Sequence, residues 1–265
     1  MKWSKESTRL THFERNSNLT HQILVKVALF VTCIVDQLFP KVGECTVNVL
    51  RRAGCEVEFD DRQTCCGQPA FNSGYRNKAR GFAERFIEIF ESSEADAIVS
   101  PSGSCTAMVK HFHELFPDDE QWRIRAERIA EKTHELGSFL VNVLGVKDMG
   151  AAFNGRVGFH DACHGLRDLG IKQQPRELLA SVTNVEMVEL PDAEVCCGFG
   201  GTFSVKYPEV SVQMVDRKIK SIEEADIRAV VSCDSSCLMQ LGGRLSRNGS
   251  NVKTMHLAEI LDSQE

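Results

Sequence analysis

The 265-residue chain has no excess of basic residues and no hydrophobic run long enough to form a membrane helix. Its 31 Lys and Arg residues are outnumbered by 37 Asp and Glu residues, which gives a net charge of −6. Binding nucleic acid requires basic side chains that neutralise phosphates, so this charge argues against nucleic acid as a partner. The apolar segment at residues 23–31 is interrupted by Lys26 and is much shorter than the roughly 20 residues that span a bilayer. The sequence therefore predicts no membrane span.

Motifs for common cofactors and for hydrolases are also missing. Residues 197–203 are rich in glycine but lack the third glycine of a dinucleotide-binding loop, and no acidic residue follows at the distance needed to hold a ribose. There is no phosphate-binding Walker loop and no Ser/His/Asp arrangement. We therefore expect no NAD or flavin. Without a hydride acceptor, the chain is predicted to carry electrons or to depend on partner proteins.

Cysteine, in contrast, is abundant, with eleven residues. The first 22 residues are polar, of mixed charge and without the apolar core of a secretory signal. We expect residues 1–24 to form a flexible N-terminal extension and the protein to be cytoplasmic. Thiols stay reduced in the cytoplasm, where cysteines bind metals more often than they form disulfides.

Most of the cysteines belong to an internal repeat. A set in the first half, Cys33, Cys65, Cys66 and Cys105, recurs in the second half as Cys163, Cys196, Cys197 and Cys237. The matched positions are 130, 131, 131 and 132 residues apart, and both Cys-Cys pairs continue into glycine. Such a small drift over a whole repeat indicates a duplication. We predict two Cys-Cys-Gly repeats, at residues 25–118 and 151–265, joined by a connecting helix within 119–150.

Strands and helices alternate in each half. Strands are predicted over residues 25–31, 55–59 and 97–100 in the first half, and over 156–159, 185–190 and 228–232 in the second. Helices are predicted over 41–53, 76–92 and 209–225, and a long packing helix over 122–144. This alternation predicts an α/β fold of two pseudo-symmetric repeats, each a small parallel sheet with flanking helices and a Cys-Cys-Gly loop.

The repeated cysteines follow the carboxyl ends of these strands, which gather at one edge of a parallel sheet. Grouped thiolates bind zinc, copper(I) or iron–sulfur clusters. Structural zinc usually takes its ligands from closely spaced Cys pairs, whereas adjacent cysteines can serve different irons of one cluster. We predict one iron–sulfur cluster in each half, with zinc, redox disulfides or plain packing of the cysteines as alternatives. Gly67 and Gly198 are expected to let the backbone approach the cluster.

Two cysteines and three histidines need separate interpretation. Cys45 lies in a predicted helix and Cys55 begins a predicted strand, so both are expected to be buried small apolar residues. His160 and His164 flank Cys163, and His256 precedes a last helix. We interpret all three as solvated or hydrogen-bonded loop histidines. A hydrogen bond to cluster sulfur, or proton donation, is the alternative for the two that flank Cys163.

Longer motifs surround the cysteines, namely Phe30-Val-Thr-Cys33, Thr64-Cys-Cys-Gly-Gln-Pro-Ala70, Asn72-Ser-Gly-Tyr75, Ser100-Pro-Ser-Gly-Ser-Cys105, residues 195–206 and Met255-His-Leu-Ala-Glu259. With them, residues 25–262 resemble the lactate utilisation protein A family, whose paired Cys-Cys-Gly domains are similar to those of heterodisulfide reductase. The resemblance implies an iron–sulfur electron-transfer subunit of a cytoplasmic complex that oxidises L-lactate to pyruvate. It also implies two partners, a ferredoxin-like iron–sulfur protein and a third small subunit.

The same resemblance implies that each set of cysteines holds a cluster, either [4Fe–4S] or the non-cubane form that five thiolates hold in the reductase. The second half offers Cys233 as a fifth candidate ligand, but three residues separate it from Cys237 where the reductase has two. Pro101 takes the place of Cys233 in the first half. The candidate ligands are therefore Cys33, Cys65, Cys66, Cys105, Cys163, Cys196, Cys197, Cys233 and Cys237. A catalytic subunit that cleaves a disulfide substrate at a cluster is the alternative function, and a zinc-stabilised scaffold is a third.

Overall fold

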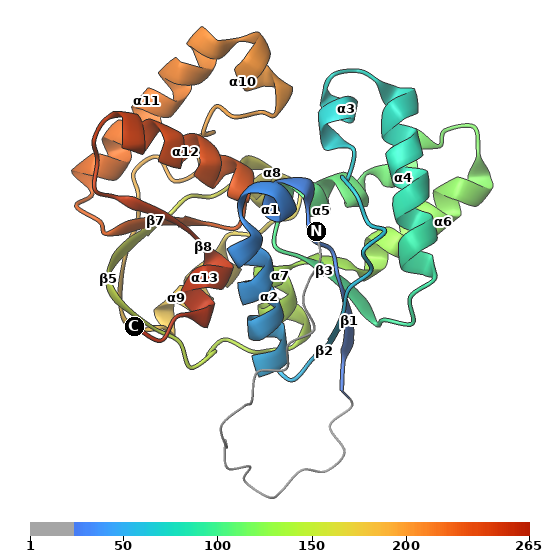
Figure 1. The fold of residues 1–265 in the computed structure, drawn as a ribbon, viewed down its shortest axis with the longest axis horizontal. Helices are drawn as coiled ribbons and strands as arrows, with labels where there is room; N and C mark the ends of the chain where they lie inside the picture. Colours follow the sequence, from blue (N-terminus) through green and yellow to red (C-terminus); the bar gives the residue numbers. More distant parts are fainter. Residues whose placement is uncertain (1–23) are drawn as a thin grey trace, which may run out of the picture.

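The computed structural model describes residues 24–265, and it consists of two four-stranded parallel sheets with helices around them (Figure 1). The first sheet has the order β2-β1-β3-β4 and the second β6-β5-β7-β8. Their bounds are β1 Lys26–Leu29, β2 Glu56–Glu58, β3 Ala97–Ser100 and β4 Thr133–Glu135, then β5 Ala152–Phe159, β6 Thr183–Val188, β7 Ala229–Ser232 and β8 Lys253–His256. The predicted α/β fold of two pseudo-symmetric repeats is confirmed. The N-terminal extension predicted over residues 1–24 lies, but for its last residue, outside the described residues.

Helices follow the strands in matching order in the two lobes, which we define as the two sheets with their helices. The first lobe contains α1 Cys33–Leu38, α2 Pro40–Arg52, α3 Gln68–Asn72, α4 Arg76–Glu91, α5 Gly103–Lys110, η1 Phe112–Leu115 and α6 Glu120–Lys132. The second contains α8 Cys163–Arg167, α9 Gln173–Ala180, α10 Thr202–Lys206, α11 Pro208–Glu224, α12 Ser235–Arg247 and α13 Leu257–Asp262. The short α7 Leu136–Ser138 and η2 Phe139–Val143 connect the lobes. No helix among the described residues is long and apolar enough to cross a membrane.

The central strands are the most deeply buried elements. β3 (Ala-Ile-Val-Ser) and β7 (Ala-Val-Val-Ser) are buried at every position, as expected for parallel strands covered on both faces. α4 and α6 cover the outer face of the first sheet, and α11 and α12 cover that of the second. α2, α7, α9 and α13 lie between the sheets and build one core from both lobes. The two lobes are therefore held together by a shared hydrophobic interior.

The prediction of a single helix over residues 122–144 is wrong. α6 ends at Lys132, and Thr133–Glu135 form β4, in which Thr133 pairs with Ile98 of β3. Without β4, the edge of β3 would leave backbone groups without hydrogen bonds inside the protein, and β-branched Thr133 favours an extended backbone. Pairing with the sheet therefore outweighs the helical spacing of the apolar residues. β8 occupies the matching edge of the second sheet.

The lobes also meet where α5 and α12 begin. Ser102 and Asp234, which cap these two helices, form an isolated antiparallel bridge. The Asp234 carboxylate accepts hydrogen bonds from the backbone N–H of Ser236 in its own helix (3.1 Å) and of Ser104 in the other lobe (2.8 Å). Since each helix carries a repeated cysteine in its first turn, this contact places the two cysteine sets on either side of the junction between the lobes.

Candidate metal centre

Four of the repeated cysteines lie in the first turn of a helix. Cys33 and Cys163 are the first residues of α1 and α8, and Cys105 and Cys237 are the third residues of α5 and α12. The free N–H groups and the dipole at a helix N-terminus stabilise a nearby negative charge. For Cys33 and Cys163, the hydrogen bond to Cys65 or Cys196 and burial raise the pKa overall, although the backbone N–H of Ile34 or His164 lowers it.

The Cys-Cys pairs lie in loops shaped by the glycine that follows them. Gly67 and Gly198 have positive φ angles of 81° and 84°. A Cβ at Gly67 would lie 2.9 Å from Cβ of Phe82, and one at Gly198 would lie 2.8 Å from the Ser211 carbonyl oxygen. The glycines thus permit a left-handed turn packed against α4 and α11. A Cβ would thus point at these helices, whereas the backbone N–H of Gly67 and of Gly198 donates to Sγ of Cys65 and of Cys196, each at 3.4 Å. The approach of this backbone to a cluster stays a prediction.

The structure brings the repeated cysteines together into two groups of four. We name Cys33, Cys65, Cys66 and Cys105 the first quartet, and Cys163, Cys196, Cys197 and Cys237 the second quartet. Sγ of Cys33 lies 3.6 Å from Sγ of Cys65. Hydrogen bonds from Cys33 and Cys66 lower the pKa of Cys65 well below its ordinary value, and bonds from Cys163 and Cys197 do the same for Cys196. Each quartet therefore stabilises a thiolate even without a metal.

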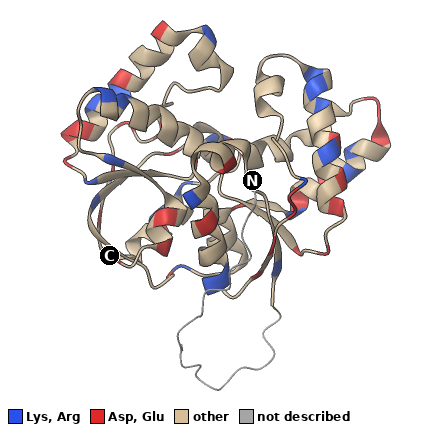
Figure 2. Ribbon diagram, viewed as in Figure 1, with Lys and Arg blue, Asp and Glu red and all other residues tan. Residues whose placement is uncertain are grey.

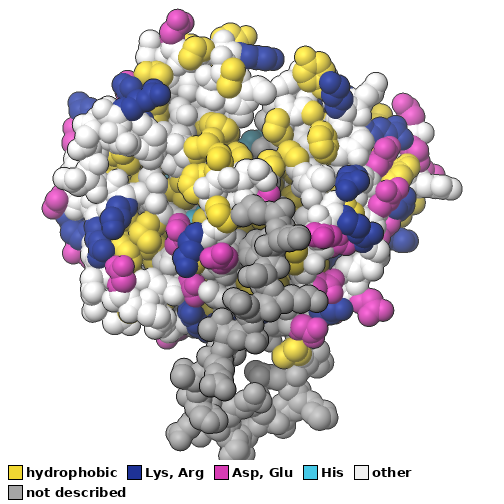
Figure 3. Space-filling model, viewed as in Figure 1, with side chains coloured by type: hydrophobic (Ala, Val, Ile, Leu, Met, Phe, Trp, Pro, Cys, Tyr) yellow, Lys and Arg dark blue, Asp and Glu magenta, His cyan; other side chains and the backbone are white. Residues whose placement is uncertain are grey.

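Both quartets open into one cavity of about 110 Å³ between the lobes, and all eight of their cysteines line it. Cys66, Cys105, Cys197 and Cys237 are buried, whereas the other four are partly exposed. Figure 3 shows the hollow between the lobes, with hydrophobic side chains on both sides. Grouped thiols that are closed on the inside and accessible at the rim fit a metal or iron–sulfur cluster in each lobe.

Cys233, the ninth predicted ligand, does not line this cavity. Its buried thiol contacts the carboxyl group of Glu135, which projects from β4 in the other lobe, and burial raises the pKa of both groups. At the equivalent place across the junction, Nε2 of His256 lies 2.9 Å from the Pro101 carbonyl oxygen. The structure thus sets Cys233 apart from the second quartet, and its role as a ligand stays a prediction.

The other cysteines are free thiols as well. All eleven cysteines of the chain are unpaired, which gives no support to the disulfide alternative. Cys45 and Cys55 are buried in the shared core, as predicted. The structure therefore separates two packing cysteines from the eight that line the cavity.

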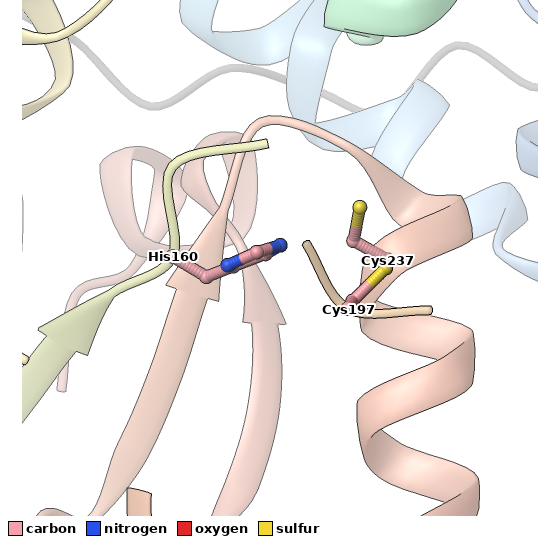
Figure 4. A group of neighbouring side chains, drawn as sticks. All are labelled: His160, Cys197 and Cys237. Atoms are coloured by element: carbon pink, nitrogen blue, oxygen red, sulfur yellow. The ribbon is translucent and has the colours of Figure 1, made fainter. Parts of the chain in front are cut away.

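The three histidines differ sharply in their surroundings. His164 is partly exposed, and its Nδ1 lies 2.6 Å from an Asp168 carboxylate oxygen. Both ring nitrogens of buried His256 are bonded, since Nδ1 accepts from the Ala258 N–H. His160 is also fully buried, but its Nε2 has no hydrogen-bond partner. Its ring points from the end of β5 toward Cys197 and Cys237 (Figure 4), so the predicted loop histidine lies inside the site.

Lys218 is a site residue that the sequence analysis missed. It lies on α11, is 0% exposed, and its ammonium group donates hydrogen bonds to the carbonyl oxygens of Asp192 and Ala193. The thiols of Cys197 and Cys237 are close enough to contribute to its electrostatic surroundings. Burial is the main cause that lowers its pKa, to about 8. A lysine within the apolar stripe of the predicted helix 209–225 was the signal that could have identified it.

Comparison with known proteins identifies the same two segments. The family model of the cysteine-rich domain CCG matches residues 27–110 and 157–242. Lactate utilization protein A of Bacillus subtilis (strain 168) is 49% identical over 240 residues, which cover 91% of this chain and 100% of the relative. Lactate utilization protein A of Exiguobacterium sp. (strain ATCC BAA-1283 / AT1b) is 52% identical over 236 residues, or 89% of this chain and 96% of the relative.

A solved structure shares the fold at low sequence identity. The crystal structure of a hypothetical protein from Helicobacter pylori superposes with a TM-score of 0.64 and 9% identity, and the match covers 89% of this chain and 48% of that chain. This similarity concerns the fold alone.

Proposed function

Because the chain belongs to the lactate utilization protein A family and contains two cysteine-rich domains, we propose that it is an iron–sulfur electron-transfer subunit of a cytoplasmic complex that oxidises L-lactate to pyruvate. The observation that carries this proposal is the convergence of eight thiols, in two matched quartets, on one cavity. Clusters held there would accept and release single electrons. Oxidation of lactate to pyruvate releases two electrons and two protons, so two one-electron sites in one chain match the reaction.

The residues of the chain hold such clusters in a defined environment. The N-termini of α1, α5, α8 and α12 direct partial positive charge at the thiolates, and the inner cysteines of each quartet are shielded from water. Cys33, Cys65, Cys163 and Cys196 form the partly exposed edges. Electrons would enter and leave along these edges, where a partner's redox centre can come close.

The segments that follow the cavity-lining residues Asn72 and Gly201 offer a surface for partners. Val205 of α10 is 80% exposed, and the later residues Tyr207, Val210 and Val212 are also exposed, as is Tyr75 on the first lobe. Charged side chains lie on the outer helices and on α2 and α13 between the sheets, whereas the ribbon around α5 and α8 is largely uncharged (Figure 2). Exposed apolar surface of this kind is typical of protein interfaces. We propose that it contacts the ferredoxin-like iron–sulfur protein and the third small subunit.

The test is lactate-dependent reduction of a one-electron dye by protein prepared without oxygen. We expect no activity from the chain alone and activity when the two proposed partners are co-purified with it. Cys197→Ser should abolish the activity of the complex, whereas Cys55→Ser, a buried cysteine outside the quartets, should retain it. A complex that lacks this chain but oxidises lactate at the full rate would refute the proposal. So would normal growth on L-lactate of a strain without this gene and without another lactate dehydrogenase.

A disulfide-cleaving function is the second candidate, and the shared cavity favours it, because a disulfide bound there could contact both quartets. The assay that separates the two functions supplies reduced dye and a small organic disulfide to the isolated chain. Release of thiols by the chain, with no lactate oxidation by the complex, would support the second candidate. The first candidate predicts the opposite pattern.

A further inference from the structure

The two quartets lie against different side chains, and the repeat makes this difference visible. Positions 30 and 160 are equivalent. Each directly follows an inner strand of its sheet, β1 or β5, and each donates its backbone N–H to the carbonyl oxygen of Val99 or Val231. Positions 86 and 218 are equivalent as well. Gly67 packs against Phe82 and Gly198 against Met214, and positions 86 and 218 each lie four residues further along α4 or α11.

Behind the first quartet, both positions are aromatic and apolar. Phe30 and Phe86 are buried and pack edge to face, with ring centroids 4.8 Å apart. Neither side chain offers a metal donor. Behind the second quartet, the same positions hold His160 and Lys218, which are both fully buried. The duplicated lobes therefore place apolar side chains behind the first quartet and polar side chains behind the second.

The hydrogen bonds of His160 determine which ring nitrogen is free. Nδ1 lies 3.2 Å from the Ala193 carbonyl oxygen, and a carbonyl oxygen only accepts, so Nδ1 carries the hydrogen. The ammonium group of Lys218 bonds to the same oxygen at 2.9 Å, and its positive charge opposes a second proton on the ring. Nε2 consequently has a free lone pair, and it is buried without a hydrogen-bond partner.

This lone pair faces the second quartet. A ring nitrogen of His160 and Sγ of Cys197 and Cys237 all lie within 4.8 Å of one another, a spacing at which one metal ion can be bound by all three. The outer nitrogen of the ring is the one directed toward the two thiols (Figure 4). The loop that carries the ring is fixed, because Asp161 accepts two hydrogen bonds from Arg176, both 2.9 Å long. Histidines that bind metals commonly donate their other N–H to a backbone carbonyl, as His160 does.

We propose that Nε2 of His160 is a metal donor of the second site, which is therefore a mixed sulfur–nitrogen site, whereas the first site binds its metal through sulfur alone. Where the bound metal is taken to be an iron–sulfur cluster, this inference rests on the proposed function. A neutral imidazole donates less negative charge to a cluster than a thiolate does, so a nitrogen donor raises the reduction potential. The two clusters would then have different potentials, with the second reduced more readily than the first.

The test is pulsed EPR on chain labelled with ¹⁵N-histidine and purified without oxygen, recorded at a series of applied potentials, with iron and acid-labile sulfide measured on the same samples. We expect a strong nitrogen coupling in the unmodified chain. His160→Cys should keep the iron and lose the coupling, and His160→Phe, which copies the first lobe, should also lose it. His164→Phe is the matched control, because this histidine is adjacent to Cys163 and should not contribute the coupling.

The outcomes separate this inference from the iron–sulfur assignment. Iron and sulfide without a nitrogen coupling, or a coupling that survives His160→Cys, would overturn the role of His160 alone. Absence of sulfide would overturn the iron–sulfur assignment. In that case, the absorption spectrum of the full chain loaded with Co²⁺ tests the donor directly. A shift toward an all-thiolate spectrum in His160→Cys would support the nitrogen donor, and an unchanged spectrum would overturn it.

Discussion

At the scale of single residues, the eight quartet thiols and Cys233 have different environments, although all nine are predicted ligands. The quartet cysteines contact one another and line the cavity, whereas Cys233 contacts the buried carboxyl group of Glu135. Their chemistry should differ accordingly. Cys237, four residues further along, provides a matched comparison within the same segment.

We predict that Cys237→Ser removes the iron of the second lobe, because a quartet loses a thiolate that a hydroxyl replaces poorly. Cys233→Ser should retain the iron and change mainly the free energy of unfolding, by about 1–3 kcal/mol, since a hydroxyl replaces a thiol in a buried site. Iron per chain and urea unfolding of the two variants test this expectation. Equal loss of iron from both variants would contradict this prediction and would indicate that Cys233 is a ligand.

His256 makes a prediction for the pH dependence of stability. Burial lowers its pKa to about 4 from the ordinary value of 6.5, so the folded protein favours the neutral ring. The stabilisation is fully present above pH 6.5 and is lost as the pH falls toward 4, by up to roughly 3 kcal/mol across this window. His256→Gln can still hydrogen-bond but cannot titrate. The urea midpoint should therefore fall less between pH 7.5 and pH 5.5 in this variant than in the unmodified chain. An equal fall in both proteins would contradict the assignment of this pH dependence to His256.

At the scale of elements, helix N-termini do most to position the site. α5 and α12 begin next to each other, and Asp234 caps one helix while it binds the backbone of the other. A capping residue that also binds the other lobe should contribute more to the free energy of unfolding than one whose contacts stay within its own lobe. Asp119 is the comparison within one lobe, since it caps α6 by accepting a hydrogen bond from the N–H of Trp122 and pairs with the partly exposed Arg80 of α4.

We predict that Asp234→Ala lowers the free energy of unfolding by about 2–3 kcal/mol, because it removes the cap and leaves a backbone N–H of the other lobe unpaired. Asp119→Ala should cost about 1 kcal/mol. Urea unfolding of the two variants at equal iron content provides the measurement. Equal losses would show that the contact between the lobes contributes little.

Lys218 allows a prediction about the potential of the second cluster. Its buried ammonium group adds positive charge near Cys197 and Cys237, and this charge stabilises the reduced, more negative cluster. Lys218→Met should lower the reduction potential of one cluster by tens of millivolts, in an EPR-monitored redox titration. Phe86→Met at the equivalent position is the control and should leave both potentials almost unchanged. A shift of the same size in both variants would contradict an electrostatic role.

These elements also show how much of the structure could be predicted from the sequence. The strand at 97–100 and the positions of the quartets were predictable, because burial and the repeat leave clear patterns. β4 was not, since its apolar residues also fit helical spacing and only the open edge of β3 selects a strand. The separation of Cys233 from the quartet was not predictable either. It depends on Glu135, which a contact between the lobes brings close to it.

At the scale of the whole molecule, two copies of one unit have joined so that their cysteine-bearing edges face a common cavity. The shared core of α2, α7, α9 and α13 keeps the lobes in place, and the first turns of α1, α5, α8 and α12 line the cavity. Under the proposed function, this arrangement would hold two redox centres close together, at an opening where partners could bind. The difference between buried Phe30 and buried His160 would then make the two centres unequal within a nearly symmetric frame.

The most direct test of the two-centre account is the iron, acid-labile sulfide and zinc content per chain of protein purified without oxygen, together with the Cys66→Ser and Cys197→Ser variants and their combination. We predict iron and sulfide in equal amounts in the unmodified chain, about half of each in either single variant, and almost none in the double variant. Stoichiometric zinc without sulfide, or a single variant that loses all of its iron, would contradict the presence of two separate iron–sulfur centres.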